Sequence, residues 1–322
     1  MILIISNKWD ITVDFVIREL NVAGYPYLRI NTEDLRSGCA TVTIPDFHIY
    51  VSKQSQLYDL TEDIRVVWNR RAGKPFDDVP KREKPTQATE RFVNDQWYSW
   101  LESLQLLPEV TWINHPRSND AMESKIRQLM LAARVGFTIP DTLISNDAEV
   151  VRQKIAQYGG KIIAKALYSP LIEEPEEDYF IFTNEIGESD VKDEEQLRIA
   201  PVIFQKPFVP KVDYRVTVVG DVVLAAKIVA DNPFSVELDW RTQKDGLDFV
   251  QCTLPNEVEE LCRNYVKESG LVFGAIDLVE HRGNFIFLEI NPNGEWGWLQ
   301  KPYGLPIAQT LCDLMIRVDG GS

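Results

Sequence analysis

Apolar residues in the first hundred positions follow two alternating periodicities. Residues 2–5 form a short apolar run of the kind found in buried parallel strands. Apolar residues then recur at helical spacing up to Gly24, at Val13, Val16, Ile17 and Leu20. Three further strand-like runs follow, at residues 42–44, 48–51 and 64–68. The apolar positions between 93 and 104 predict a long amphipathic helix that belongs to the core.

After residue 110 this alternation gives way to blocks of strands. A short strand at 111–113 precedes a helix that we expect to be capped by Asn119 or Asp120 and to run to Gly136. Further strands are expected at residues 142–144, 161–165, 202–230, 272–280 and 284–290. Further helices are expected after Asp147, at 257–269 and after Gly304. Helices and strands segregate here, so we expect α+β sheets in this half and a parallel α/β unit before it.

The composition is that of a globular protein with an acidic surface. Of 322 residues, 44% are hydrophobic and 26% are charged, and the formal net charge is −15. Such a surface repels nucleic acids and anionic membranes and favours a basic or neutral peptide partner. No run of about 18 apolar residues is present to span a membrane, and the N-terminus lacks the basic segment of a signal peptide. We therefore expect a cytoplasmic protein.

Residues 273–291 predict a hairpin that carries acidic side chains on one face. With a three-residue turn at 282–284, Asp277 lies directly opposite Glu289, and Asn291 projects from the same face. The other face is apolar, with Ile276, Leu278, Ile286, Leu288 and Ile290. Two carboxylates and an amide oxygen are hard ligands suited to Mg²⁺ bound to nucleotide phosphates. Solvated acids on an edge hairpin are the alternative, and the strongly apolar hairpin argues against it.

Basic side chains that could face phosphates lie on two predicted elements. Lys125 lies in the segment that opens the helix ending at Gly136, and Lys165 ends an apolar strand. Either lysine alone could be a snorkelling surface residue, but the acidic hairpin makes the two together informative. A strand that runs into a Pro-containing hinge could leave backbone amides free for an adenine edge, at Gln205, Lys206, Pro207 and Phe208.

A third group of polar residues lies between the hinge and the hairpin. Asp213 and Arg215 alternate onto one face of a strand, Lys227 lies on the strand after it, and Arg241 lies in a polar loop. Guanidinium groups suit oxyanions because they offer a bidentate fork. A surface ion pair remains the alternative for each of these residues taken singly.

This ordered set of residues resembles the ATP-grasp superfamily of ligases. More narrowly, the runs at 112–114, 213–221 and 288–298 are similar to the graspetide maturases, typified by microviridin ligases. The resemblance covers nearly the whole chain and implies an ATP-grasp fold of mixed α/β and α+β class. It implies an N-terminal pre-ATP-grasp α/β domain at 1–115, a central subdomain at 116–200 and a C-terminal subdomain with the metal-binding hairpin at 201–322.

The resemblance also implies a role for each candidate residue. The phosphates of ATP would contact Lys125 and Lys165. Adenine would lie against the hinge of Gln205, Lys206, Pro207 and Phe208, with Asp213 also in the nucleotide site. Magnesium would be held by Asp277, Glu289 and Asn291. The acyl phosphate would be steadied by Arg215, Lys227 and Arg241.

Two features separate this chain from the broader superfamily. No glycine follows Lys165 until Gly187, so a glycine-rich phosphate loop is not supported. This argues against a small-substrate ligase and agrees with the graspetide branch. Acidic residues also crowd positions 173–195, and the resemblance implies that a basic residue of a leader peptide binds near Asp193, Glu194 and Glu195. This acidic run lies between Lys165 and the hinge, so we expect it to lie close to the nucleotide cleft. A solvated acidic face is the alternative.

The sequence thus favours a peptide ligase that uses ATP and Mg²⁺. An Asp or Glu side chain of a ribosomal precursor peptide would be phosphorylated, and a Ser, Thr or Lys of that peptide would attack it to close a macrolactone or macrolactam. One alternative is a ligase of the same fold that adds free amino acids to a protein or peptide terminus. Another is a non-catalytic nucleotide- and peptide-binding module, against which the intact set Asp277, Glu289 and Asn291 argues. We also expect a homodimer.

Overall fold

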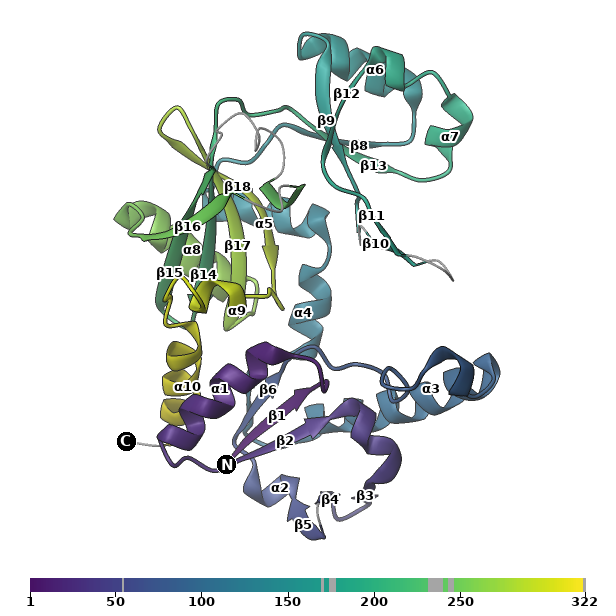
Figure 1. Cartoon of the computed structure of the whole chain (residues 1–322), viewed down its shortest axis with the longest axis vertical. Coiled ribbons are helices and arrows are strands. Elements are labelled where there is room, and N and C mark those ends of the chain that lie inside the picture. Colours follow the sequence, from purple (N-terminus) through teal and green to yellow (C-terminus); the bar gives the residue numbers. More distant parts are fainter. Residues whose placement is uncertain (54, 169–170, 174–177, 231–239, 243–245, 321–322) are drawn as a thin grey trace.

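The computed structural model describes residues 1–53, 55–168, 171–173, 178–230, 240–242 and 246–320. The chain forms three lobes (Figure 1): an N-terminal α/β domain, a C-terminal sheet above it, and a central subdomain that projects to one side at the top. Among the described residues, no helix combines the length and the apolar character needed to cross a membrane.

The N-terminal domain is built on a parallel four-stranded sheet, as the alternating pattern predicts. In spatial order its strands are β2 (Tyr27–Asn31), β1 (Ile2–Ser6), β6 (Val66–Asn69) and β7 (Thr111–Ile113). The helix α1 (Ile11–Val22) joins the first two strands along the chain. A small antiparallel sheet packs beside the main one with the short helix α2 (Leu60–Asp63), and consists of β3 (Cys39–Thr43), β4 (His48–Lys53) and β5 (Gln56–Asp59).

The long helix α3 (Gln87–Ser103) is present as predicted, but it is not a core helix. None of its 17 residues, all of them described, is fully buried, and the helix extends away from the sheet (Figure 1). Trp97, Trp100 and Leu101 are half-buried against the apolar cluster of the N-terminal sheet. The prediction was wrong because a narrow apolar stripe on a mostly polar helix covers the edge of a core without entering it.

The single helix predicted before Gly136 is two helices, α4 (Pro116–Met122) and α5 (Lys125–Val135). Neither Asn119 nor Asp120 is a cap, because His115 caps α4 and Ser124 caps α5. The Ser124 side chain accepts a hydrogen bond from the backbone N–H of Arg127. The helix α5 packs on the C-terminal sheet. The predicted central subdomain at 116–200 includes α5, and so groups this helix with the central sheet, which it does not cover.

The central subdomain is a four-stranded antiparallel sheet with helices on one side. Its strands, in spatial order, are β12 (Asn184–Gly187), β9 (Lys161–Lys165), β13 (Val202–Gln205) and β8 (Thr142–Ser145). The helices α6 (Ala148–Gln157) and α7 (Glu194–Arg198) share an apolar cluster with this sheet. A separate hairpin of β10 (Leu171–Glu173) and β11 (Asp178–Phe180) projects below it (Figure 1).

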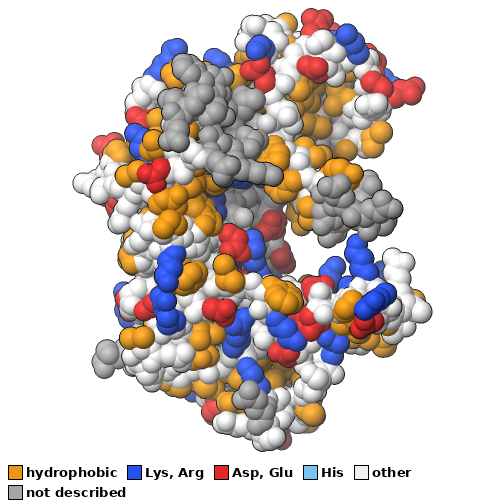
Figure 2. Space-filling view, in the orientation of Figure 1, with side chains coloured by type: hydrophobic (Ala, Val, Ile, Leu, Met, Phe, Trp, Pro, Cys, Tyr) orange, Lys and Arg blue, Asp and Glu red, His pale blue; other side chains and the backbone are white. Residues whose placement is uncertain are grey.

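The C-terminal sheet has five antiparallel strands and two differently covered faces. Their spatial order is β16 (Leu247–Cys252), β15 (Val222–Ala230), β14 (Val212–Val219), β17 (Phe273–His281) and β18 (Asn284–Asn291). One face packs on α5 and α8 (Asn256–Glu268). The other packs on α9 (Gly297–Gln300) and α10 (Ile307–Val318), in a cluster shared with α1 and the N-terminal sheet. Figure 2 shows a hollow between the N-terminal domain and the central subdomain, with charged side chains on its walls.

Candidate nucleotide and magnesium site

The hairpin of β17 and β18 brings Asp277 directly opposite Glu289, as predicted, but through a different turn. His281 pairs with Asn284, which leaves a two-residue turn at 282–283 with positive φ angles of 51° and 79°. The register then shifts by one residue next to Asp277, where β18 carries an extra residue. The predicted turn was one residue too long and the bulge adds one residue, so the two differences cancel at the acidic pair.

The bulge changes which side chains enter the core. Phe287 is fully buried together with Ile276 and Ile290, whereas Leu288 lines an open cleft beside Glu289. The prediction that Leu288 belongs to the apolar face was therefore wrong. A regular period of two cannot hold across an inserted residue.

Asp277 is held by a buried arginine on the neighbouring strand. Arg215 on β14 lies opposite it in register, and Nη1 of Arg215 is 2.9 Å from Oδ1 of Asp277. Both side chains are about nine-tenths buried. A Cβ added at Gly294 would lie 2.8 Å from Nη2 of Arg215, so the glycine makes room for the guanidinium group.

Glu289 is surrounded by positive charge. Its Oε2 lies 2.5 Å from Nζ of Lys125, and its Oε1 lies 3.2 Å from Nη1 of Arg241. Burial would raise the pKa of Glu289, but the charges of Lys125, Arg241 and Lys165 outweigh it and hold that pKa well below its usual range. The carboxylate is therefore ionised at neutral pH, as a magnesium ligand must be.

These side chains face a cleft between the central sheet and the C-terminal sheet. The C-terminal sheet contributes Asp213, Asp277 and Glu289, β9 contributes Lys165, and the hinge contributes Pro207 and Phe208. Arg241 borders the same cleft, in the described part of a loop whose residues 231–239 and 243–245 lie outside the described residues. Acids and cations from distant segments thus meet at one opening.

Asp277, Glu289 and Asn291 suit a magnesium ion that is shared with nucleotide phosphates. Oδ1 of Asn291 accepts a hydrogen bond from the backbone N–H of Asn293 at 3.0 Å, and an amide oxygen has a second lone pair for a metal. Among the described residues, no cluster of three or more His, Cys, Asp or Glu side chains could hold a metal alone. Mg²⁺ commonly uses one or two carboxylates and takes its remaining ligands from phosphates and water.

Comparison with known proteins identifies the fold family. The model of the RimK-like ATP-grasp domain matches residues 122–315. The chain belongs to this family. The ATP-grasp fold and the resemblance to ATP-grasp ligases are thereby confirmed. No curated protein matches the chain by sequence.

Solved structures of other ATP-grasp enzymes resemble the whole chain. Macrocyclase MdnC from Microcystis aeruginosa MRC, solved with the precursor peptide MdnA, is 25% identical, with a TM-score of 0.84 over 98% of this chain and 99% of that chain. A RiPP-associated ATP-grasp ligase from Chryseobacterium gregarium, in complex with ADP and a leader and core peptide, is 24% identical, with a TM-score of 0.83 over 98% and 96%. D-alanine–D-alanine ligase from Bacillus anthracis, in complex with ATP, is 14% identical, with a TM-score of 0.60 over 98% and 95%.

Lys227 lies on the opposite face of the ATP-grasp sheet from the other predicted residues. It pairs with Tyr214, whereas Arg215 pairs with Ala226. Because strand side chains alternate, Lys227 projects to the face covered by α5 and α8, away from Arg215 and Asp277. We therefore correct its placement beside the acyl phosphate.

Two residues of the predicted hinge also point elsewhere. Gln205 is buried, and its side-chain amide donates to Oγ1 of Thr142 at 2.9 Å. Nζ of Lys206 lies 6.0 Å from the ring centroid of Tyr158. Any contact of these two residues with adenine would have to come from their backbone, which is what the hinge prediction proposes.

Two further residues of the cleft, Lys211 and Trp240, were not predicted from the sequence. Nζ of Lys211 lies 2.6 Å from both carboxylate oxygens of Asp213, and both side chains are more than nine-tenths buried. Lys211 directly precedes β14, and its spacing of two from Asp213 could have revealed this pair. Trp240 borders the cleft next to Arg241 and packs against Trp298, with ring centroids 5.7 Å apart.

The predicted leader-binding acids lie on α7, far from the C-terminal sheet (Figure 1). Asp193 caps this helix by accepting from the backbone N–H of Glu195 and of Gln196, and Glu194 lies 2.9 Å from Nη2 of Arg152. The acidic run was expected to lie close to the nucleotide cleft, and this was wrong for α7. Residues 174–177 of that run lie outside the described residues.

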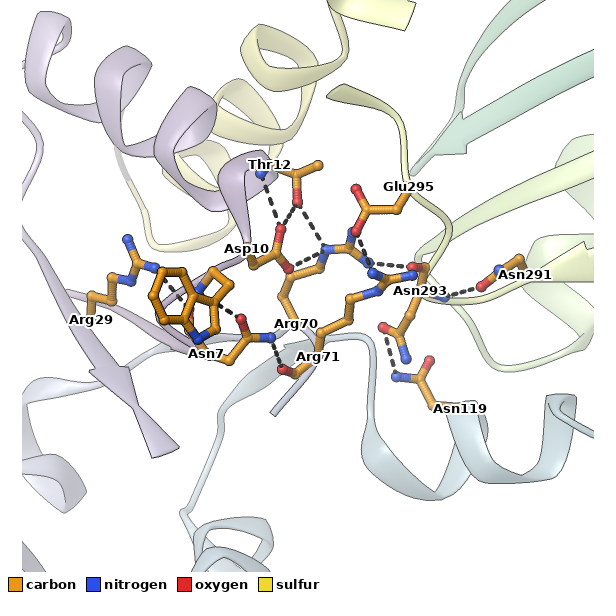
Figure 3. A network of polar contacts seen from close by, with 11 residues as sticks. Asn7, Asp10, Thr12, Arg29, Arg70, Arg71, Asn119, Asn291, Asn293 and Glu295 are labelled. Atoms are coloured by element: carbon orange, nitrogen blue, oxygen red, sulfur yellow. Dashed lines mark hydrogen bonds and ion pairs between the residues drawn. The ribbon is translucent and has the colours of Figure 1, made fainter. Parts of the chain in front are cut away.

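A buried arginine joins the N-terminal domain to the loop that follows the hairpin of β17 and β18 (Figure 3). Arg70, only 1% exposed, contacts Asp10 at 3.1 Å and donates to the backbone oxygen of Asn293. Glu295 in the same loop contacts both Arg70 and Arg71. These contacts fix the chain just beyond Asn291, and the sequence did not predict them.

Proposed function

We propose that this chain is an ATP- and magnesium-dependent ligase that cross-links a ribosomal precursor peptide. An Asp or Glu side chain of the peptide is activated as an acyl phosphate, and a Ser, Thr or Lys of the same peptide then closes a macrolactone or macrolactam. The observation that carries this proposal is the pairing of Asp277 with Glu289 in a cleft lined by cations. The peptide substrates in the similar structures from M. aeruginosa and C. gregarium support its substrate class.

In this proposal the basic residues bind phosphate groups and the acidic residues bind the metal. Lys125 and Lys165 bind the nucleotide phosphates, and the backbone of the hinge at 205–208 holds adenine. Arg215 and Arg241 stabilise the negative charge of the peptide acyl phosphate, because each can offer two parallel N–H donors to oxyanions. When bound by Asp277, Glu289 and Asn291, Mg²⁺ neutralises the phosphate charge that develops during transfer.

The chemistry consists of two displacements, and neither needs an enzyme nucleophile. The peptide carboxylate attacks the terminal phosphorus of ATP, and ADP leaves. The peptide hydroxyl or amine then attacks the acyl carbon, and phosphate leaves. Positioning both peptide groups beside the cleft supplies most of the rate, as in intramolecular reactions.

Intact-mass spectrometry of the peptide tests this function. The chain is incubated with ATP, Mg²⁺ and the short peptide rich in Ser, Thr, Asp and Glu that we expect to be encoded beside its gene. Loss of one water per cross-link is the expected result. A gain in mass would instead indicate addition of amino acids, and an unchanged mass with no release of ADP would indicate a non-catalytic binding module.

Three further properties belong to the same proposal. A basic residue of the leader peptide binds near Asp193, Glu194 and Glu195, the enzyme acts in the cytoplasm, and it forms a homodimer. Light scattering on the purified chain tests the last of these, because a homodimer has twice the mass of the 36.9 kDa chain.

A further inference from the structure

The strand β18 carries two of the proposed magnesium ligands and lies at the edge of the C-terminal sheet. In an antiparallel edge strand, every second residue turns its backbone N–H and C=O away from the sheet, and these groups need partners elsewhere. Ile290 is such a residue, and it lies between Glu289 and Asn291 in the sequence. The group that pairs with the backbone of Ile290 therefore influences where both ligands lie.

A buried glutamine on α5 provides this partner. Oε1 of Gln128 accepts from the backbone N–H of Ile290 at 3.1 Å, and its Nε2 donates to the backbone oxygen of Ile290 at 2.9 Å. Nε2 also donates to the backbone oxygen of Met122, the last residue of α4, at 2.6 Å. Gln128 is only 3% exposed. Its side chain thus pairs with Ile290 as a neighbouring strand would, and both of its N–H donors are in use.

The same helix places a cation on one of the two ligands. Lys125 is the first residue of α5, and its Nζ lies 2.5 Å from Oε2 of Glu289. Residues three apart on a helix lie on the same side, and α5 packs along β18 (Figure 1). Lys125 therefore contacts the side chain of Glu289, while Gln128 holds the backbone of the next residue. Through these two side chains, α5 fixes the proposed phosphate-binding lysine and the ligand strand relative to each other.

The chain is held on the other side of Asn291 as well. Asn114, which follows β7 and is 2% exposed, donates from Nδ2 to the backbone oxygen of Pro292 at 3.1 Å. Its Oδ1 accepts from the backbone N–H of Phe273 at 2.8 Å, so this amide joins the two ends of the hairpin. The backbone N–H of Asn293 donates to Oδ1 of Asn291 and orients that side chain (Figure 3). Buried amides from outside the hairpin thus fix the backbone immediately before and after Asn291.

The edge of β18 has a second contact that involves backbone groups alone. The N–H of Phe287 donates to the backbone oxygen of Thr138 at 2.9 Å, so the edge is covered there without a side chain. Gln128 differs because its hydrogen bonds fall on the residue between the two ligands. An apolar residue at position 128 would leave the N–H and C=O of Ile290 buried without a partner, and the strand would shift at that residue to satisfy them.

We propose that Gln128 is a positioning residue for the magnesium centre, which sets the spacing between Glu289, Asn291 and the ammonium of Lys125. The inference rests on the proposed function, because it requires that these side chains meet Mg²⁺ and nucleotide phosphates. Removal of a group that orients metal ligands commonly lowers metal affinity by roughly 10- to 100-fold. The Mg²⁺-dependent part of nucleotide affinity therefore depends on Gln128, whereas Lys125 attracts phosphate whether or not Mg²⁺ is present.

Nucleotide binding with and without metal tests this role. Calorimetry on the full chain measures the Kd of a non-hydrolysable ATP analogue in excess Mg²⁺ and in EDTA. Gln128→Met keeps the length of the side chain and removes all three of its hydrogen bonds. We expect this variant to bind the analogue roughly tenfold or more weakly in Mg²⁺, with a nearly unchanged Kd in EDTA. An unchanged Kd in Mg²⁺, or equal weakening in both solutions, would overturn the positioning role.

Tyr265→Phe is the matched control for a loss of stability. The hydroxyl of the fully buried Tyr265 donates to the backbone oxygen of Gln128 at 3.2 Å. This variant therefore removes a buried hydrogen bond at the same residue and leaves the Gln128 side chain intact. We expect both variants to unfold at a lower urea concentration, and only Gln128→Met to lose Mg²⁺-dependent affinity. An equal loss of that affinity in Tyr265→Phe would show that the role of Gln128 is structural only.

Hydrogen exchange on the unmodified protein tests the contact even if Gln128→Met does not fold. The backbone amide of Ile290 should exchange as slowly as that of Phe287, which donates to Thr138 on the same edge. Exchange at the rate of the exposed turn residue Gly283 would show that Gln128 does not hold β18, and would overturn the inference.

The unmodified protein separates this inference from the function on which it rests. If Mg²⁺ does not tighten nucleotide binding to the unmodified chain, the magnesium centre and this inference are both wrong. If Mg²⁺ tightens binding equally in the unmodified chain and in Gln128→Met, this inference alone is wrong. A large gain from Mg²⁺ in the unmodified chain and a much smaller gain in Gln128→Met is the expected result.

Discussion

The guanidinium group of Arg215 lies opposite the carboxylate of Asp277 across two neighbouring strands, with 2.9 Å between Nη1 and Oδ1. The two side chains are only 9% and 11% exposed. Removal of either charge would leave the other buried and unpaired. Such an ion lowers the stability of the folded state, because it has lost its hydration and gained no partner. This pair links the stability of the sheet to the proposed metal site.

Replacement of Asp277 by Asn should therefore affect stability as well as activity. We expect the free energy of unfolding to fall by about 3 kcal/mol, because Arg215 is left as an unpaired buried charge. Urea unfolding of both proteins measures the difference. The double variant Arg215→Met with Asp277→Leu removes both charges and should lose less than the sum of the single variants. An unchanged unfolding midpoint for Asp277→Asn would contradict the account of this pair.

Lys165→Ala should weaken ATP binding. A charge-assisted contact between an ammonium and phosphate contributes about 1.5–3 kcal/mol, which corresponds to roughly a 10- to 150-fold change in Kd. Calorimetry with a non-hydrolysable ATP analogue measures it. Lys161→Ala is the matched control, because Lys161 begins the same strand and its side chain is 70% exposed beside Glu185. Equal ATP affinity of the two variants would show that Lys165 does not bind the phosphates of ATP.

Glu295→Gln should raise the concentration of Mg²⁺ needed for nucleotide binding. Glu295 contacts Arg70 and Arg71, and these contacts hold the loop that follows Asn291. The loss of a partly exposed ion pair is worth about 1 kcal/mol, so we expect roughly a fivefold increase. Titration of Mg²⁺ in the presence of the ATP analogue measures it, with Glu83→Gln, on an exposed surface pair, as the control. The same Mg²⁺ requirement in both variants would show that the loop contacts do not support the metal site.

Replacement of Asp193, Glu194 and Glu195 by Ala should lower leader-peptide affinity and retain ATP binding. The triple variant also destabilises α7, because Asp193 caps this helix and its loss alone costs about 1 kcal/mol of helix stability. Glu194→Gln with Glu195→Gln preserves the cap. Glu149→Gln is the matched control, since Glu149 also lies beside Arg152, at 3.7 Å, but on α6. Titration calorimetry at low and moderate salt measures the affinity for the leader peptide. An unchanged affinity would mean that the acids of α7 form a solvated acidic surface and do not bind the leader.

Local periodicity together with an assumed three-residue turn aligned the acidic pair of the hairpin. Side chains on a strand repeat every two residues, so Asp277 and Glu289 could be aligned once a hairpin was assumed. The two-residue turn and the bulge at β18 could not be predicted, because neither Gly283 nor Leu288 carries a signal that fixes its register. The alignment was correct because the two differences are equal and opposite.

Lys227 shows where sequence reasoning could have gone further. The turn between β14 and β15 is the two-residue pair Gly220 and Asp221, and it sets the pairing of Tyr214 with Lys227. Gly-Asp is a recognised hairpin turn, so the opposite face of Lys227 was predictable. In contrast, the contacts of Arg70 with Asn293 and Glu295 join segments more than 200 residues apart in the sequence, and no local pattern reports them.

The central claim is that the hairpin of β17 and β18 is the magnesium and nucleotide centre of a peptide ligase, and Glu289→Gln tests it most directly. This variant keeps the shape of a side chain that contacts Lys125 and Arg241 but removes the charge that would bind the metal. The measurement is release of ADP with saturating Mg²⁺, ATP and the precursor peptide, with circular dichroism as the check on folding. We predict that peptide-dependent ADP release is abolished in a folded variant, and release at the rate of the unmodified protein would contradict the account.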